Sequence, residues 1–150
     1  MRKLLLAAIA GVSSIALAPS AHAAQFLTTS GPTGTFGNDS VMCSGTTPCS
    51  FSRTFSFMTP TSFNLASATI SSAIAGIADI DNIDFSSVTL KGVDFTTVAT
   101  GAVEFRNLLN QALTPGGSNS LIVNGTSGGN GAFAGTLAFA AIPAVPEPAT

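Results

Sequence analysis

The sequence predicts an all-β fold, a single antiparallel β-sandwich or jelly-roll-like domain, on three observations. Apolar and polar residues alternate over 51–57 and again over 133–139, which is the period of a strand with one buried face. Short segments rich in Phe, Val, Ile and Thr recur along the chain, separated by clusters of Gly, Pro, Asn and Asp. Eleven Phe residues, without Trp or Tyr, supply the apolar side chains of a core.

Residues 1–23 have the order of parts of a secretory signal peptide. Arg2 and Lys3 form a positive start, an apolar run follows, and Ala21 and Ala23 form a small-x-small cleavage site. The apolar run is shorter than the roughly 20 residues that a membrane-spanning helix needs. We therefore expect signal peptidase to remove this segment; a retained membrane anchor or a buried helix are the alternatives.

The domain is predicted over 24–142, and its first half contains one strand with a conflict. The alternating segment 51–57 places three Phe residues on one face, and Arg53 falls on that same face. A charge there needs a partner, or a place at a sheet edge from which the side chain reaches water. The other elements expected in this half are a strand at 24–30, turns at 31–34 and 37–39, a strand at 63–74 and a polar connection at 77–84.

The second half contains two local signals. The apolar parity of a strand at 85–90 shifts across Ser86 and Ser87, which predicts a bulge or a strand boundary. Lys91 and Gly92 then form a tight hairpin turn. The remaining expectations are strands at 102–105, 121–123 and 133–139, one or two helical turns at 107–113, a glycine-rich loop at 125–131 and an extended Pro-rich linker at 143–150.

Cys43 and Cys49 are the two cysteines of the chain, close enough in sequence to close a small loop. In an oxidising compartment such a pair forms a disulfide, which agrees with export. The alternative is two reduced thiols. A metal site is disfavoured because no histidine or further cysteine accompanies the pair.

Charge excludes one class of partner. Without the leader, three cations face seven carboxylates, so the net charge is −4. No basic patch is present to neutralise phosphates, and we therefore expect no nucleic-acid binding.

The usual catalytic side chains are scarce. The only histidine, His22, lies in the leader, which removes Ser–His and Cys–His chemistry from the mature chain. Asp94 and Glu104 are a forced choice for a carboxylate pair of the glycosidase type, since nothing in the sequence selects them. We expect no enzyme activity and no cofactor.

An oxygen-rich segment holds the one candidate metal site. Asp79, Asp81 and Asp84 carry ligand types that calcium prefers, but the Gly and the later Glu of a helix–loop–helix calcium site are missing. The favoured interpretation is a solvated turn whose side chains bond to the backbone. Similarly, the alternating Phe residues are interpreted as core rather than as a ligand platform.

The segment at 145–150 resembles the start of a PEP-CTERM sorting region, in which Pro146, Glu147 and Pro148 match the motif. In that family the motif precedes a membrane-spanning helix and a basic cluster, and an exosortase processes the tail. Neither feature occurs before Thr150. The segments 51–55, 82–85 and 124–131 resemble a subgroup marked by Phe-x-Asp-x-Phe. Arg53 replaces that Asp, so no role of the Asp is carried over.

The resemblance implies a non-catalytic protein of the outer surface or extracellular matrix of a Gram-negative bacterium. Its implied partners are signal peptidase, an exosortase-type enzyme and exopolysaccharide, with transient membrane anchoring through a tail. The alternative function is a secreted carbohydrate-binding module. The absence of Trp and Tyr counts against that alternative, because sugar platforms usually use those rings.

Overall fold

The computed structural model describes residues 25–42, 48–73 and 82–143, and these form two antiparallel sheets packed face to face. The predicted β-sandwich is confirmed. Ten strands occur in this part of the chain: β1 Gln25–Ser30, β2 Thr33–Met42, β3 Cys49–Met58, β4 Leu65–Ala73, β5 Ile83–Leu90, β6 Val93–Asp94, β7 Thr96–Ala99, β8 Phe105–Ala112, β9 Ser118–Ser127 and β10 Asn130–Ala140.

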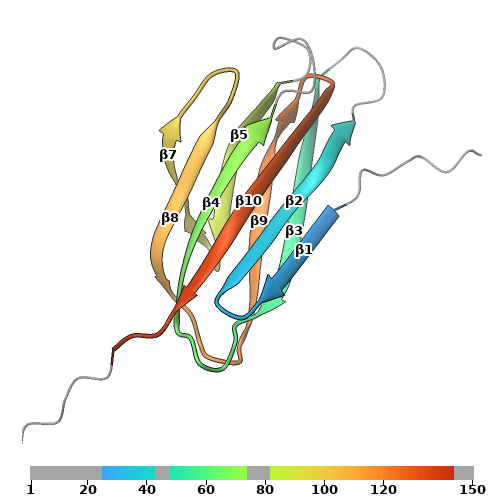
Figure 1. Cartoon of the computed structure of the whole chain (residues 1–150). Helices are drawn as coiled ribbons and strands as arrows, with labels where there is room; N and C mark the ends of the chain where they lie inside the picture. The colour runs from blue at the N-terminus through green and yellow to red at the C-terminus, as the bar shows by residue number, and fades with distance from the viewer. Residues whose placement is uncertain (1–24, 43–47, 74–81, 144–150) are drawn as a thin grey trace, which may run out of the picture.

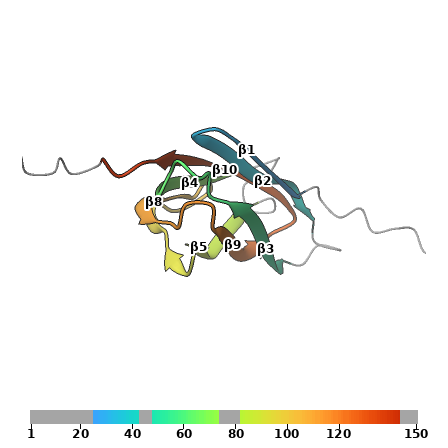
Figure 2. The same ribbon diagram turned by 90° about the horizontal axis from the view of Figure 1, so that it is seen from below.

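The two sheets differ in width. The larger, sheet A, has the order β1-β2-β10-β4-β8-β7 and faces the viewer in Figure 1. The smaller, sheet B, has the order β3-β9-β5-β6 and forms the second layer, which Figure 2 shows from below. The last strand, β10, lies inside sheet A between β2 and β4, so two strands from the first half of the chain flank it.

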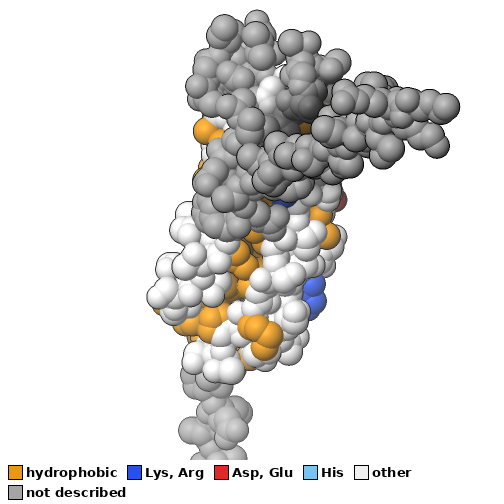
Figure 3. All heavy atoms as spheres, turned by 90° about the vertical axis from the view of Figure 1, so that its right-hand side faces the viewer, with side chains coloured by type: hydrophobic (Ala, Val, Ile, Leu, Met, Phe, Trp, Pro, Cys, Tyr) orange, Lys and Arg blue, Asp and Glu red, His pale blue; other side chains and the backbone are white. Residues whose placement is uncertain are grey.

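The core lies between the sheets and contains most of the Phe residues. In β3 the three Phe side chains are buried and the residues between them are exposed, apart from half-buried Arg53. Phe133 contacts the rings of Phe51, Phe55 and Phe85, and so joins both sheets. The interpretation of the alternating Phe residues as core is confirmed. Seen from the side of β1 and β3, apolar side chains form a strip between polar surfaces (Figure 3).

One close approach within this core requires glycine. A Cβ atom on Gly135 of β10 would overlap the ring of Phe36 and the carbonyl oxygen of Thr69. The ring of Phe36 thus occupies the space of the missing side chain, and it is fully buried there.

Arg53 was expected to have either a charge partner or a position at a sheet edge, and the structure places it at an edge. β3 is an edge strand of sheet B, and the half-buried Arg53 side chain donates from Nη1 to the carbonyl of Ser52 at 3.1 Å in a solvent-exposed hydrogen bond. An edge position lets the stem pack against apolar neighbours while the guanidinium meets water.

Two local predictions around β5 are also confirmed. The register of β5 against β9 shifts between Phe85 and Ser87, which is the expected bulge. Lys91 and Gly92 both have positive φ, 52° and 78°, as a two-residue hairpin between β5 and β6 requires.

Four boundaries differ from the predictions. The expected helical turns at 107–113 are wrong: β8 covers Phe105–Ala112, because pairing with β4 and β7 overrides the helix preference of Leu, Gln and Ala. Of the strand expected at 102–105, only Phe105 is in a strand, as the first residue of β8, and residues 102 and 103 form a bend before it. The turn at 37–39 lies inside β2, and the loop at 125–131 shrinks to Gly128 and Gly129, because β9 and β10 extend toward each other.

Two further expectations shift slightly. The connection at 77–84 ends earlier than expected, since Ile83 and Asp84 already belong to β5. The strand expected at 63–74 is confirmed as β4, Leu65–Ala73, and its inward residues alternate with half-buried ones.

Candidate functional site

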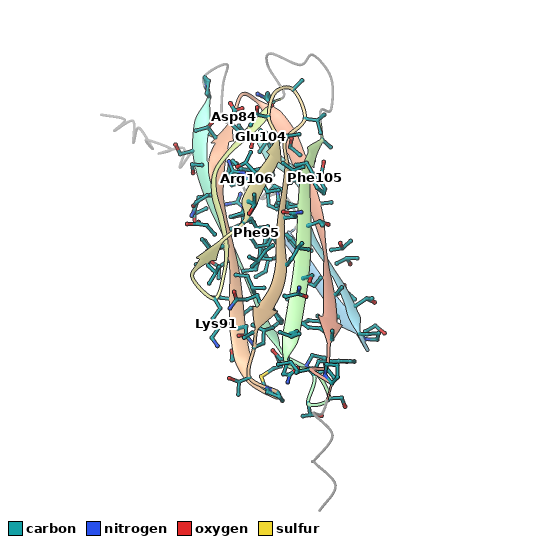
Figure 4. The ribbon with its side chains drawn as sticks, turned by 90° about the vertical axis from the view of Figure 1, so that its left-hand side faces the viewer. Asp84, Lys91, Phe95, Glu104, Phe105 and Arg106 are labelled. Carbon is teal, nitrogen blue, oxygen red and sulfur yellow. The ribbon has the colours of Figure 1, made fainter. Side chains whose placement is uncertain are left out.

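A buried charged cluster joins the two sheets at one edge of the sandwich. Glu104 immediately precedes β8 of sheet A and Arg106 is its second residue, and both reach Phe85 of β5 in sheet B. The Glu104 carboxylate accepts the Phe85 backbone N–H at 2.8 Å, and Arg106 donates to the Phe85 carbonyl. Figure 4 shows Asp84, Glu104 and Arg106 at the same end of the molecule.

The two side chains also form an ion pair with each other and contact neighbouring groups. Arg106 Nη2 lies 3.7 Å from Glu104 Oε2, and the side chains are 12% and 8% exposed. The Arg106 guanidinium carbon lies 5.8 Å from the centre of the Phe85 ring. The Glu104 backbone N–H donates to Ser72 Oγ at 2.7 Å, which fixes the start of β8 against β4.

This cluster stabilises an uncovered sheet edge. β6 pairs only with Thr89 and Leu90 of β5, so the N–H and C=O of Phe85 have no neighbouring strand on that side. Side chains from the opposite sheet supply the missing partners. A carboxylate held in this way by an arginine and a backbone N–H is occupied, which favours a structural role over acid–base catalysis.

The forced carboxylate pair gains no support from this arrangement. Asp94 is exposed on β6, whereas Glu104 is buried and bonded to Phe85 and Arg106. The two acids therefore have different surroundings and different partners.

The predicted oxygen-rich site is only partly described. Asp84 is exposed and accepts a hydrogen bond from Asn82 Nδ2 at 3.0 Å, in keeping with a side chain that bonds locally. Asp79 and Asp81 lie outside the described residues. Within the described ranges no group of three or more His, Cys, Asp or Glu side chains is placed to hold a metal ion.

Other predicted site residues lie mostly outside the described part. Cys49 begins β3 and pairs in register with Ser127, whereas Cys43 is not described, so the disulfide stays a prediction. Ala21 and Ala23 of the cleavage site, and Pro146, Glu147 and Pro148 of the sorting motif, are also outside.

A second candidate lies on the outer face of sheet A. The residues that point outward from β2, β4 and β10 are small, and beside them the half-buried Phe105 of β8 stands next to Ser71. Together they form a shallow hollow of about 450 Å³, within the range of small-ligand sites. Its outward-pointing lining residues are Thr35, Thr69, Ser71, Phe105, Ala134 and Thr136.

Threonines continue the hollow into a row across the whole sheet. The pairing register aligns one residue from each of the six strands. In spatial order the row consists of Thr28, Thr35, Thr136, Thr69, Asn107 and Thr96. The hydroxyls of Thr69 and Thr136 lie 2.9 Å apart and share one hydrogen bond. We call these six residues the threonine row.

Sequence reasoning did not find Phe105, the threonine row or the Glu104–Arg106–Phe85 cluster. From the sequence, Glu104 is only one of two acids that no pattern selects, and Phe105 is only the end of a short predicted strand. Alternate threonines such as Thr33 and Thr35 were a visible signal. Which threonines lie side by side depends on pairing between distant segments, and a single sequence does not give that register.

Comparison with known proteins adds no function. The chain matches no family model, no curated protein and no solved structure. No helix long and apolar enough to cross a membrane occurs in the residues that the structure describes.

Proposed function

We propose that the chain is an exported, non-catalytic protein of the bacterial surface or extracellular matrix, sorted by a PEP-CTERM and exosortase type of system. Signal peptidase removes residues 1–23, and the motif Pro146-Glu147-Pro148 directs processing at the other end. The sandwich between them is the part that functions after export.

The position of the sandwich between these two signals is the observation that supports the proposal most. β1 begins at Gln25, two residues after the expected cleavage site, and β10 ends at Ala140, just before the Pro-rich segment. The described strands thus lie between the two expected signals, as a folded unit flanked by removable or processed segments requires.

The surface of the sandwich agrees with an extracellular, non-catalytic role. The outward side chains of β3 and β4 are mainly Ser and Thr, and the described charges that are buried are the mutually bonded Glu104 and Arg106. A neutral hydroxyl surface is well hydrated and offers few groups for proton transfer.

The test is the processing of the protein expressed from its own gene in a Gram-negative host that carries an exosortase-type enzyme. We expect mass spectrometry of the exported protein to find Ala24 at the N-terminus. Ala23→Phe blocks that cleavage, because the cleavage site requires a small residue, whereas the matched change Ala10→Phe in the apolar run leaves it intact.

The other end is tested in the same cells. Glu147→Ala is expected to leave the protein unprocessed at its C-terminal side, and the neighbouring Ala144→Ser is expected to have no effect. An unprocessed chain that stays in the cytosol contradicts the whole proposal, and processing that ignores Glu147→Ala contradicts the sorting route alone.

A further inference from the structure

We infer that the outer face of sheet A binds a neutral polysaccharide chain, with Phe105 as its stacking ring and the threonine row as its hydrogen-bonding track. The inference gives the proposed matrix protein its ligand, and in that sense it rests on the proposed function. The residues that support it, however, all belong to the described outer face of sheet A.

The first step is the chemistry of the hollow. A sugar ring has one apolar C–H face and a rim of hydroxyls, so it suits a site with one exposed ring and several hydroxyl groups. Phe105 supplies the ring, while Ser71, Thr69 and Thr136 supply hydroxyls around it. Phe105 is half-buried on the outer face, whereas Phe51, Phe55 and Phe133 fill the core.

The second step is charge. The charged side chains that the structure describes lie on sheet B, in the connections, or facing inward from sheet A; the side chain of Asp39 in β2 is outside this description. Glu104 and Arg106 bond inward to β5, and Arg53, Asp84, Lys91 and Asp94 belong to β3, β5, the turn after β5, and β6. A charged polymer would therefore find no counter-charge among the described side chains of this face. A neutral polymer does not need one.

The third step is length. Neighbouring strands lie about 4.8 Å apart, so a row that crosses six strands spans roughly 24 Å. That is several sugar units, and the hollow occupies only the part of the row over β2, β10 and β4. A chain lying along the row thus gains contacts with each added unit, which an isolated monosaccharide does not.

The polar character of the row separates this ligand from a second copy of the same chain. Faces that pack against another sheet are apolar, as the inward faces of sheets A and B are here. The threonine row instead presents hydroxyls that keep hydrogen-bonding capacity even after the Thr69–Thr136 bond, because each hydroxyl has one donor and two acceptor sites. Sugar hydroxyls can both donate to them and accept from them.

The experiment is affinity electrophoresis and calorimetry of the purified exported chain. The neutral probes are galactomannan and mixed-linkage β-glucan, and the anionic probe is alginate. We expect at least one neutral polymer to retard the protein and alginate not to do so. Affinity for β-glucan or mannan oligosaccharides is expected to rise steadily from disaccharide to hexasaccharide.

Three variants locate the site. Phe105→Ala is expected to weaken binding by at least about tenfold, because it removes the stacking ring. Thr136→Val, which exchanges a hydroxyl for a methyl group of similar size, is expected to weaken binding several-fold. The matched control, Thr126→Val on the outward face of β9 in sheet B, is expected to bind like the unmodified protein.

Each other outcome overturns the inference. Any of three results would show that the face is not a neutral-glycan site. These are a folded chain that no neutral polymer retards, binding of alginate as strong as that of a neutral polymer, and a loss of affinity in Thr126→Val as large as in Thr136→Val. Self-association that Phe105→Ala abolishes, without glycan binding, assigns the face to a second copy instead. None of these results bears on the processing at Ala23 and Glu147, so glycan binding and sorting can be contradicted independently of each other.

Discussion

Glu104 and Arg106 act as substitutes for a missing strand. Their side chains provide an acceptor and a donor to the backbone of Phe85, at the part of β5 that β6 does not reach. A buried pair of this kind contributes little relative to an apolar replacement of both residues, but it makes each residue depend strongly on the other.

Removing one member of this pair should therefore cost more than removing both. We expect Glu104→Ala to lower the free energy of unfolding by about 3 kcal/mol, because it leaves a buried cation and the Phe85 N–H without their acceptor. The double variant Glu104→Ala, Arg106→Met should lose less than the sum of the single changes, as measured by urea denaturation in a double-mutant cycle.

A matched control for this cycle is Asp94→Ala. Asp94 is an exposed acid on β6, so its removal should change stability by less than about 0.5 kcal/mol. Additive effects at 104 and 106 would show that the two side chains do not act as one unit.

At the scale of single strands, the exposed edge of β3 shows how a charge on an apolar face can be useful. Arg53 stands on the face that carries the buried Phe residues, at the end of sheet B. An inward-facing charge on an edge strand opposes pairing with a second molecule, because the new neighbour would desolvate the charge.

Arg53→Val is accordingly expected to make the protein self-associate. Its stability should change by less than about 1 kcal/mol, since Val suits a strand and the Arg53 side chain is only half-buried. Light scattering should report concentration-dependent growth for Arg53→Val and none for Arg53→Lys. A monomeric Arg53→Val protein at the same concentrations would show that the charge of Arg53 does not prevent association through the edge of β3.

The connection between β2 and β3 carries the disulfide prediction. Alkylation and mass spectrometry of the exported protein should find both cysteines blocked unless a reductant is added. Closure of so short a loop should stabilise the fold by about 2 kcal/mol, and reduction should remove that amount. In the variant Cys43→Ser, Cys49→Ser, stability should not respond to the reductant; free thiols in the exported protein would contradict the prediction.

Strands that a local sequence pattern specifies were predictable, whereas strands that form only by pairing with distant segments were not. β3 and β10 alternate clearly, and the bulge at Phe85 and the turn at Lys91 were visible in the residues themselves. β8 was not, because its Leu, Asn and Gln suit a helix until β4 and β7 pair with it. The threonine row depends entirely on such pairing, so no local pattern could reveal it.

At the scale of the whole molecule, sheet A depends on its last strand. β10 pairs with β2 on one side and β4 on the other, so Thr136 lies beside Thr35, 101 positions earlier in the chain, and beside Thr69, 67 positions earlier. Without β10, the pair β1–β2 and the group β4–β8–β7 have no connection within the sheet.

A chain that ends at Ser127 is therefore expected to stay unfolded, whereas a chain that ends at Pro143 should keep the native circular-dichroism spectrum and a cooperative thermal transition. The longer truncation removes two strand partners and three buried side chains, Phe133, Leu137 and Phe139. A cooperative transition in the shorter chain would show that the remaining nine strands form a stable unit.

This dependence on β10 has a consequence for passage through a membrane. A polypeptide that leaves the ribosome N-terminus first carries two halves of a sheet that cannot close until residues near 140 arrive. A narrow translocation channel admits only an unfolded chain. Because sheet A cannot form before β10 is present, the chain stays unfolded while the earlier strands pass through. For the exported protein that we propose, the strand that connects the two parts of sheet A is thus the last strand of the sandwich to reach the far side.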